Sequence, residues 1–267
     1  MSSKKRVLIT GITGLIGQIV YDDLKRDYEI TGLARRPFPG VRHFQGSIDN
    51  LDAILPAFEG QDVVVHMAAD PSMFATWESV LPNNLVGTYN AYEASKRMGV
   101  KRFIFASSNH ATGMYERDHP YDYIVRGEYA KAKLLVRQVT HEAEIRPDGY
   151  YGISKAYGEA MGRYYAEEHG LSVICLRIGT CNQHNSPLKN IRHFATWLSH
   201  RDQAQLVRKS IEAPDSLKFD IFYGVSANKW RFWDTEHPRK VIGYQPEDNA
   251  ETYRSQFDAS KAGPATG

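Results

Sequence analysis

A tyrosine and a lysine stand four residues apart in the stretch RPDGYYGISKAYGE, which covers residues 146 to 159. In a helix, Tyr151 and Lys155 would lie on the same face, so that the phenol and the ammonium group can meet. An ammonium group beside a phenol stabilises the phenolate and is expected to lower the pKa of the tyrosine. Tyr151 is therefore a candidate general base toward an alcohol, with simple packing of the two side chains as the competing interpretation.

A polar segment, FASSNHATGMY, follows the fourth apolar segment of the chain. Parallel sheets bind ligands at the carboxyl ends of their strands, so this segment is expected at a binding edge. We expect Ser108 to hydrogen-bond the same substrate oxygen as Tyr151, and Lys155 also to hold the ribose of a nicotinamide cofactor. In such a site the cofactor carries out the hydride chemistry, while the protein supplies orientation and proton transfer.

A glycine-rich loop, LITGITGLIG, lies between the first expected strand and the first expected helix. Gly11, Gly14 and Gly17 are spaced by three residues, which permits a tight turn and a close approach of main-chain N–H groups to a pyrophosphate. This context favours a dinucleotide site over a purely structural turn. The residues that we expect to contact the cofactor here are Gly11, Thr13, Gly14, Leu15, Ile16 and Gly17.

The end of the second expected strand, GLARRPFPG, indicates which dinucleotide is used. Ala34 stands where an acid would accept hydrogen bonds from the ribose hydroxyls of NAD, and Arg35 and Arg36 follow it. Arginine accommodates a 2′-phosphate, so NADP is favoured. The alternative, that both arginines are solvated loop charges, leaves NAD open. Further cofactor contacts are expected from Ser47, Ile48, Ala68, Ala69 and Ile178.

These residues require a framework of strands and helices. Apolar segments rich in β-branched residues recur with helical stretches between them, which predicts a parallel sheet with helices on both faces. The expected strands are 6–10, 29–34, 62–68, 102–107 and 172–179, with a later strand in FDIFYGV. The expected helices are 15–27, 50–58, 77–98, 151–169 and 199–212, the third beginning at TWES, which resembles a capping box.

The fold class is therefore α/β, a Rossmann doubly wound parallel sheet with a small carboxy-terminal substrate lobe. We expect a dinucleotide-binding domain over 1–179, a substrate-binding lobe over 180–260 interleaved with it, and a flexible tail over 261–267. The chain has 267 residues, of which 42% are hydrophobic and 24% charged, and a formal net charge of +2. This balance gives no electrostatic argument for a nucleic acid or membrane partner.

Cysteine and histidine usage points away from metal and disulfide chemistry. The two cysteines, Cys175 and Cys181, do not form a C-x-x-C motif, and the histidines lack the spacing of a zinc site. We expect no metal. The amino terminus, MSSKKRVLITG, contains no apolar signal-peptide core, so a reducing, cytoplasmic location is expected.

In this order and spacing, TGITGLIG, FASSNH and YGISK resemble the extended short-chain dehydrogenase/reductase family, whose members include the NAD-dependent epimerases and dehydratases. The resemblance implies that Ser108, Tyr151 and Lys155 form the catalytic triad. It also implies that Asn84 contacts the cofactor and orders a proton-relay region, and that a homo-oligomer forms through the helices at 77–98 and 151–169.

A narrower resemblance covers RPDGYYGISKAYGE, LRIGTC, ATWLSHRD, YGVSANKWRFWD and GYQPEDNAE. These segments are similar to uronate dehydrogenases and to a related glucose 6-phosphate dehydrogenase branch. The similarity implies oxidation of the anomeric carbon of an acidic or phosphorylated aldose to a lactone. It places Arg192 at the sugar carboxylate, which its planar fork suits, with a surface cation as the alternative. The implied substrate contacts are Ser72, Ser108, Asn109, His110, Tyr151, Thr180 and Arg192.

The sequence also departs from these enzymes. The segment 116–145 is longer than in uronate dehydrogenases, and its basic residues, among them Arg126 and Lys133, are interpreted as a solvated helix face rather than an anion site. Two other functions remain open. A nucleotide-sugar epimerase or dehydratase has the same triad but retains its cofactor through the cycle, and a non-catalytic NADP-binding sensor has the same fold.

Overall fold

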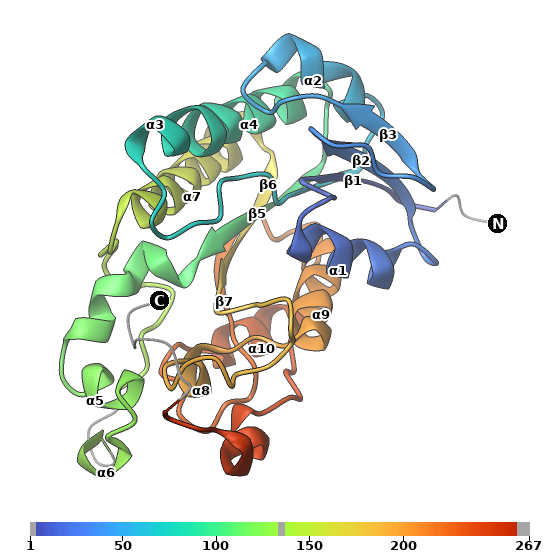
Figure 1. Ribbon diagram of the computed structural model, residues 1–267. Coiled ribbons are helices and arrows are strands. Elements are labelled where there is room, and N and C mark those ends of the chain that lie inside the picture. The colour runs from blue at the N-terminus through green and yellow to red at the C-terminus, as the bar shows by residue number, and fades with distance from the viewer. Residues whose placement is uncertain (1–3, 133–136, 261–267) are drawn as a thin grey trace.

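A computed structural model describes residues 4–132 and 137–260. The expected tail at 261–267 and the basic residue Lys133 lie outside the described residues. The described chain forms a seven-stranded sheet in the order β3-β2-β1-β4-β5-β6-β7, and every neighbouring pair of strands is parallel (Figure 1). This arrangement confirms the doubly wound parallel sheet predicted from the sequence.

The strands closely follow the apolar segments of the sequence. Their bounds are β1 Arg6–Thr10, β2 Glu29–Ala34, β3 Arg42–Gln45, β4 Val63–His66, β5 Arg102–Ser108, β6 Ser172–Ile178 and β7 Phe219–Gly224. The sequence analysis missed β3, whose four residues RHFQ contain no fully buried side chain. As an edge strand paired only with β2, it lacks the continuous apolar run of a strand covered on both faces.

Helices cover both faces of the sheet. The helices α2 Leu51–Phe58, α4 Gly87–Arg97 and α7 Tyr150–His169 lie on one face, and α1 Leu15–Leu24 and α9 His200–Ile211 lie on the other (Figure 1). Alternate residues of one strand enter the two layers: Val7 of β1 packs with the α1 and α9 side, and Leu8 packs with the α2, α4 and α7 side. Two hydrophobic layers thus hold the carboxyl ends of the strands in fixed positions.

The helix expected over 77–98 consists of three pieces. It runs as α3 Trp77–Val80, a π-helical segment η1 Leu81–Val86 and then α4, with Pro82 at the start of the π-helical segment. Thr76 holds the N-cap position of α3, but its side chain makes no capping hydrogen bond, so the expected capping box is absent. The reason is that Glu78 occupies the second helical position, whereas a capping box needs an acid at the third.

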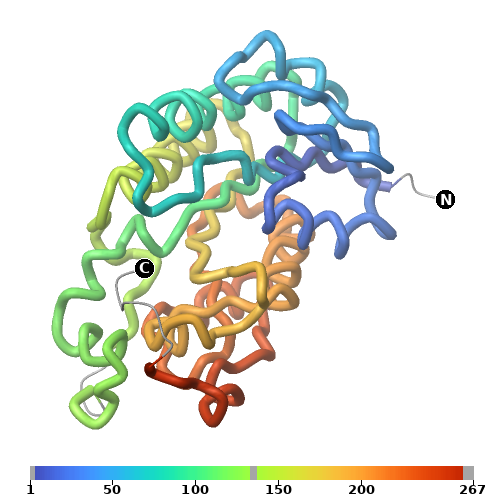
Figure 2. The backbone as a smooth tube through the Cα atoms, in the orientation of Figure 1, coloured from blue at the N-terminus to red at the C-terminus, as the bar shows by residue number. Residues whose placement is uncertain are grey.

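The residues from 109 to 132 and those after 178 meet beyond the sheet (Figure 2). The first group forms η2 Asn109–Arg117, α5 Tyr121–Val125 and α6 Tyr129–Ala132, and the second forms α8 His193–Thr196, α10 Glu236–Ile242 and η3 Ala250–Gln256 in addition to α9 and β7. Ile124 and Val125 share a buried cluster with Phe232 and Trp233. The described part of segment 116–145 therefore packs on the carboxy-terminal part of the chain through an apolar contact, and its basic residues Arg126, Lys131 and Arg137 are exposed.

Membrane insertion finds no support in the described helices, because each is too short or too polar to cross a bilayer. The expected cytoplasmic location stays a prediction.

Candidate active site

A cavity of about 610 Å³ opens at the carboxyl ends of β1, β2 and β4. It lies where the strand order reverses, which is the ligand-binding crevice of such sheets. Twelve of the residues expected to bind the cofactor line it: Gly11, Thr13, Gly14, Leu15, Ile16, Gly17, Arg35, Arg36, Ser47, Ile48, Ala68 and Ala69. We call it the cofactor cavity.

The glycine loop is built for a close backbone approach. Gly11 has a φ of +69°, and a Cβ atom on it would lie 2.7 Å from the amide nitrogen of Ala68. A Cβ atom on Gly17 would lie 2.4 Å from the carbonyl oxygen of Gly11. The loop can therefore turn tightly into α1 and present the amino end of this helix to the cavity, which favours a pyrophosphate. The residues present fit a dinucleotide.

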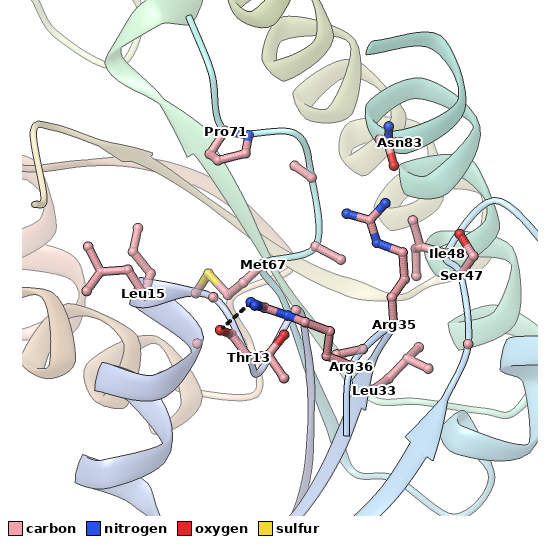
Figure 3. A pocket seen from close by; sticks show the side chains of 18 of the residues that line it. Thr13, Leu15, Leu33, Arg35, Arg36, Ser47, Ile48, Met67, Pro71 and Asn83 are labelled. Atoms are coloured by element: carbon pink, nitrogen blue, oxygen red, sulfur yellow. Dashed lines mark hydrogen bonds between the residues drawn. The ribbon is translucent and has the colours of Figure 1, made fainter. Parts of the chain in front are cut away.

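Two arginines border the cofactor cavity at the end of β2 (Figure 3). Both are exposed. Nη2 of Arg36 lies 3.5 Å from the carbonyl oxygen of Thr13, and the side chain of Arg35 points toward the side where Asn83 and Ile48 lie. The two guanidinium groups thus border the cofactor cavity, and the preference for NADP stays a prediction.

Asn84 has a different position from the one expected. It is buried, accepts a hydrogen bond from the amide of Asp70 (2.7 Å), and donates to the carbonyl oxygen of Asp70 and to Oγ of Ser154, both at 3.1 Å. It thereby ties the loop after β4 to α7. The adjacent Asn83 lines the cofactor cavity instead, because the π-helical turn changes which residues face the sheet edge.

A second cavity, of about 330 Å³, adjoins the first and is called the substrate cavity below. Ser108, Tyr151 and Lys155 line it, as do six other residues singled out from the sequence: Ile16, Ala69, Asn109, His110, Ile178 and Thr180. Arg192 also borders it. The two cavities share a wall made by Ile16, Met67, Ala69, Pro71 and Cys181. A ligand spanning both would bring its end to the triad.

Helix α7 brings Tyr151 and Lys155 to this cavity by lying very close to the sheet. A Cβ atom on Gly158 would lie 2.1 Å from the ring of Phe105 on β5, so only glycine permits this approach. Lys155 is buried, and its Nζ donates a hydrogen bond to the carbonyl oxygen of Ala106 at 2.8 Å. The same Nζ lies 5.3 Å from the centre of the Tyr151 ring.

The pKa values of the pair differ from the expectation. Burial raises the pKa of Tyr151 to about 12, although a hydrogen bond with Ser108 acts in the opposite direction. Burial also lowers the pKa of Lys155 to about 8. The prediction of a lowered tyrosine pKa is therefore wrong for the protein by itself, because loss of hydration outweighs the attraction of an ammonium group above the ring. At neutral pH both groups of the pair are therefore protonated.

The two serines at the end of β5 have different partners. Oγ of Ser107 donates to Oε1 of Glu159 at 2.6 Å, and this carboxylate also forms a buried ion pair with Arg177. Ser108 is the serine that hydrogen-bonds Tyr151. Its Oγ also accepts from the amide of His110 at 3.2 Å. Ser108 is thus positioned next to the candidate base, as expected.

His110 has a carboxylate partner that the sequence analysis did not include. Its Nδ1 lies 2.7 Å from Oδ2 of Asp148, and its ring meets that of Tyr151 edge to face at 5.8 Å. The partner fixes the ring orientation and leaves Nε2 as the other polar atom of the imidazole. Asp148 belongs to the RPDG turn immediately before α7. Its position close to Tyr151 in the sequence is the signal from which it could have been predicted as a site residue.

Arg192 borders the substrate cavity but is already paired. Its Nε lies 2.5 Å from Oε2 of Glu116, and its Nη2 lies 2.7 Å from Oε1. Nη1 donates to Oγ1 of Thr180 at 3.1 Å. The role of Arg192 at a substrate carboxylate stays a prediction. No local motif pointed to its partner Glu116, which lies 76 positions away.

Ser72 is the one expected substrate contact that lines neither cavity. Its Oγ accepts a hydrogen bond from the amide of Phe74 within an exposed turn. The substrate cavity gains Asn182, Lys189 and His193, none of which was expected there. Burial lowers the pKa of His193 to about 4, so this imidazole is neutral at pH 7.

One group of potential metal ligands lies among the described residues. His141, Asp220 and His237 have ligand atoms within 4.8 Å of one another, but they line neither cavity. Nε2 of His237 lies 2.7 Å from Oδ1 of Asp220, and the ring of His237 stacks on that of His141 at 3.6 Å. These contacts explain why the three side chains lie close together, and we assign no metal to them.

Comparisons with known proteins agree with this geometry. The model of the NAD dependent epimerase/dehydratase family matches residues 7–209. The chain is 37% identical to L-arabinose 1-dehydrogenase (NAD(P)(+)) of Haloferax volcanii, over 92% of this chain and 98% of that protein. It is 36% identical to an NAD-dependent glucose-6-phosphate dehydrogenase of the same organism, over 91% and 94% of the two chains.

A solved structure has the same fold. The uronate dehydrogenase of Agrobacterium tumefaciens, crystallised as a point mutant complexed with NAD, superimposes with a TM-score of 0.80 at 28% identity. The match covers 98% of this chain and 91% of that one. The likeness therefore extends over nearly the whole length of both chains.

Proposed function

The chain belongs to the NAD dependent epimerase/dehydratase family, and on this premise we propose that it is an NAD(P)-dependent sugar dehydrogenase that oxidises the anomeric carbon of an aldose to a lactone. Three similar proteins are named as dehydrogenases of L-arabinose, glucose 6-phosphate and uronate. The observation that carries the proposal is the joined pair of cavities, with Ser108, Tyr151 and Lys155 at the inner end.

The cofactor cavity holds the dinucleotide. The glycine loop and the amino end of α1 would hold the pyrophosphate, and Ser47 and Ile48, which line the same cavity, would contact the adenine. Arg35 and Arg36 favour NADP over NAD through a 2′-phosphate. When bound, the oxidised nicotinamide supplies the acceptor for a hydride.

The triad then removes the proton. Ser108 and Tyr151 hydrogen-bond the anomeric hydroxyl, and the phenolate of Tyr151 takes its proton. Loss of the proton would prepare the anomeric carbon to release its hydrogen as a hydride, so that one C–H and one O–H bond break and the C=O bond of a lactone forms; a bound oxidised nicotinamide would supply the two-electron acceptor. Two electrons leave the sugar with the hydride. The ammonium group of Lys155 supports the phenolate, which burial alone disfavours.

We further propose a homodimer. Exposed apolar side chains lie along α7 and the neighbouring helix, which pack against each other on the same face of the sheet (Figure 1). On α7 these are Tyr150, Ile153 and Tyr164, and on the neighbouring helical stretch they are Trp77, Leu81, Val86 and Tyr89. Exposed apolar side chains on neighbouring helices are typical of an interface between copies.

The decisive experiment is the substitution Tyr151→Phe. We expect kcat for the oxidation of an aldose to fall about a hundredfold or more, because the proton acceptor is removed. Cofactor binding should be retained. The matched control is Tyr150→Phe, since Tyr150 is exposed and its ring contacts that of Trp77 at a tilted angle, outside both cavities.

The measurement is the formation of reduced cofactor, monitored by its absorbance. Uronates, neutral aldoses and aldose 6-phosphates are each supplied with NADP and with NAD. A dehydrogenase releases one reduced cofactor per sugar oxidised. Conversion of a nucleotide-sugar without such release would establish the epimerase alternative, and unchanged turnover in Tyr151→Phe would refute the assignment of the base.

A further inference from the structure

The guanidinium group of Arg192 has its hydrogen-bonding capacity filled within the protein. An arginine side chain offers five N–H donors. Nε and Nη2 donate to the two carboxylate oxygens of Glu116, and Nη1 has Oγ1 of Thr180 at 3.1 Å and Oγ1 of Thr196 at 3.5 Å. The remaining donor of Nη2 meets Asn109. The amide orientation that satisfies both groups of Asn109 has its oxygen 2.9 Å from Nη2 and its nitrogen 3.0 Å from the carbonyl oxygen of Ile178.

The ion pair is sheltered from water. The side chains of Arg192 and Glu116 are 8% and 13% exposed, so bulk water and salt screen their attraction only weakly. Two parallel hydrogen bonds between guanidinium and carboxylate form the geometry in which arginine binds a carboxylate most specifically. Glu116 therefore occupies, from within the chain, the fork that a carboxylate of a substrate would need.

A charged sugar end would face two costs at this position. It would have to displace Glu116 from a desolvated ion pair, and Glu116 would then remain as a second negative charge close to the first. A hydroxyl or a hydrogen at the same position brings no charge into the cavity, so Glu116 can stay in its ion pair with Arg192.

We propose that Glu116 makes the substrate cavity selective for neutral aldoses, by filling the carboxylate-binding fork of Arg192. The inference rests on the proposed sugar oxidation and specifies its substrate. It replaces the expectation of an acidic sugar with that of an aldose whose end distant from the anomeric carbon carries no charge.

The other titratable groups around the cavity are consistent with a neutral ligand. His110 is paired with Asp148, His193 is neutral at pH 7, and Lys155 faces the carbonyl oxygen of Ala106. Lys189 is exposed at the rim, where water hydrates its ammonium group. Because this cation could bind a phosphate, an aldose 6-phosphate is the main alternative to a neutral substrate.

The test compares matched sugars that differ only at C6. The full-length protein with its preferred cofactor is given glucose, glucuronate and glucose 6-phosphate, and the corresponding galactose series, and kcat/KM is measured for each. We expect kcat/KM of the wild type to be about tenfold or more higher for the neutral sugar than for its uronate. The reason is that either the carboxylate of the uronate or that of Glu116 must remain unpaired. In Glu116→Ala this ratio should fall by about tenfold, because the fork becomes available.

Two controls secure the interpretation. Glu116→Gln keeps the shape but removes the charge, so it should shift the ratio in the same direction if Glu116→Ala folds poorly. Glu128→Gln removes an exposed carboxylate that pairs with Arg126 and Lys131 in the same inserted segment, and should leave the ratio unchanged.

The outcomes separate the two proposals. A wild type that prefers uronates or 6-phosphates, or a ratio that neither Glu116 variant alters, overturns the role of Glu116 while sugar oxidation stands. A protein that reduces cofactor with none of these sugars overturns the proposed function itself.

Discussion

Nζ of Lys155 lies 5.3 Å from the centre of the Tyr151 ring while it donates its hydrogen bond to the main chain of β5. The ammonium group is thus held over the ring face rather than at the hydroxyl oxygen. Because burial sets the pKa of the tyrosine to about 12 and that of the lysine to about 8, the reactive form of the pair, phenolate with ammonium, is a minor one at neutral pH.

This relationship predicts a specific pH profile. Below pH 8 both groups are protonated, so each pH unit raises the reactive fraction about tenfold. Above pH 8 the lysine loses its proton first, and the reactive form then carries as many protons as the dominant one, so its fraction becomes constant. We expect kcat/KM to rise and then level off near pH 8. Residual activity of Lys155→Met should keep rising beyond that point, and a wild-type rate that falls between pH 6 and 8 would contradict the base assignment.

Cofactor choice should depend on the two arginines after β2. We expect Arg35→Ser and Arg36→Ser each to raise the KM for NADP about tenfold, because a charge-assisted contact to the 2′-phosphate is lost, and to change the KM for NAD little. Steady-state kinetics with both cofactors measures this. Arg26→Ser, another exposed arginine outside the cofactor cavity, is the control. An equal rise in the KM for NADP and for NAD would show that the arginines do not recognise the 2′-phosphate.

The buried ion pair between Glu159 and Arg177 should dominate the stability of the α7–β6 contact. The side chains are 2% and 1% exposed, and Glu159→Gln would leave the guanidinium group of Arg177 buried without its counter-charge. We expect a loss of about 3–5 kcal/mol in the free energy of unfolding. Urea denaturation measures it, with Glu167→Gln as the control, because that residue forms an exposed pair with Arg163 on the same helix. A midpoint equal to that of the wild type would mean that the pair is replaceable by neutral contacts.

The proposed dimer can be tested on α7. Ile153 is 42% exposed in the middle of the apolar surface, and Ile153→Glu would place a charge in the interface. We expect the wild type to elute with the mass of two chains in size-exclusion chromatography with light scattering, and the variant with the mass of one. Ile145→Glu changes an isoleucine of similar exposure outside α7 and should leave the mass unchanged. A monomeric wild type would remove the proposal.

The sequence predicted the first two strands most accurately, because they are covered almost completely. β1 and β2 begin and end at the expected residues because every position after the first is covered. The edge strand β3 has no such signature. In the same way, the helix over 77–98 was recognised, but its π-helical turn was not, so the cofactor contact was assigned to Asn84 when Asn83 lines the cavity.

Within the site, the sequence could identify residues that belong to local motifs, such as Ser108, Tyr151 and Lys155. It could not identify Glu116 as the partner of Arg192, because an ion pair across 76 positions depends on where η2 and the loop before α8 meet in space. The direction of the tyrosine pKa shift was equally inaccessible, since it follows from the depth of burial and not from the spacing of the two residues.

Strand β7 has a consequence for biosynthesis. Its residues, Phe219–Gly224, follow all the other strands by more than forty positions, so β6 emerges from the ribosome with one edge bare. Until β7 has been translated, that row of unpaired amide and carbonyl groups can be bridged by another nascent chain. Slow translation through this interval should therefore increase the demand for chaperones, and premature termination within it should yield aggregates rather than a smaller working enzyme.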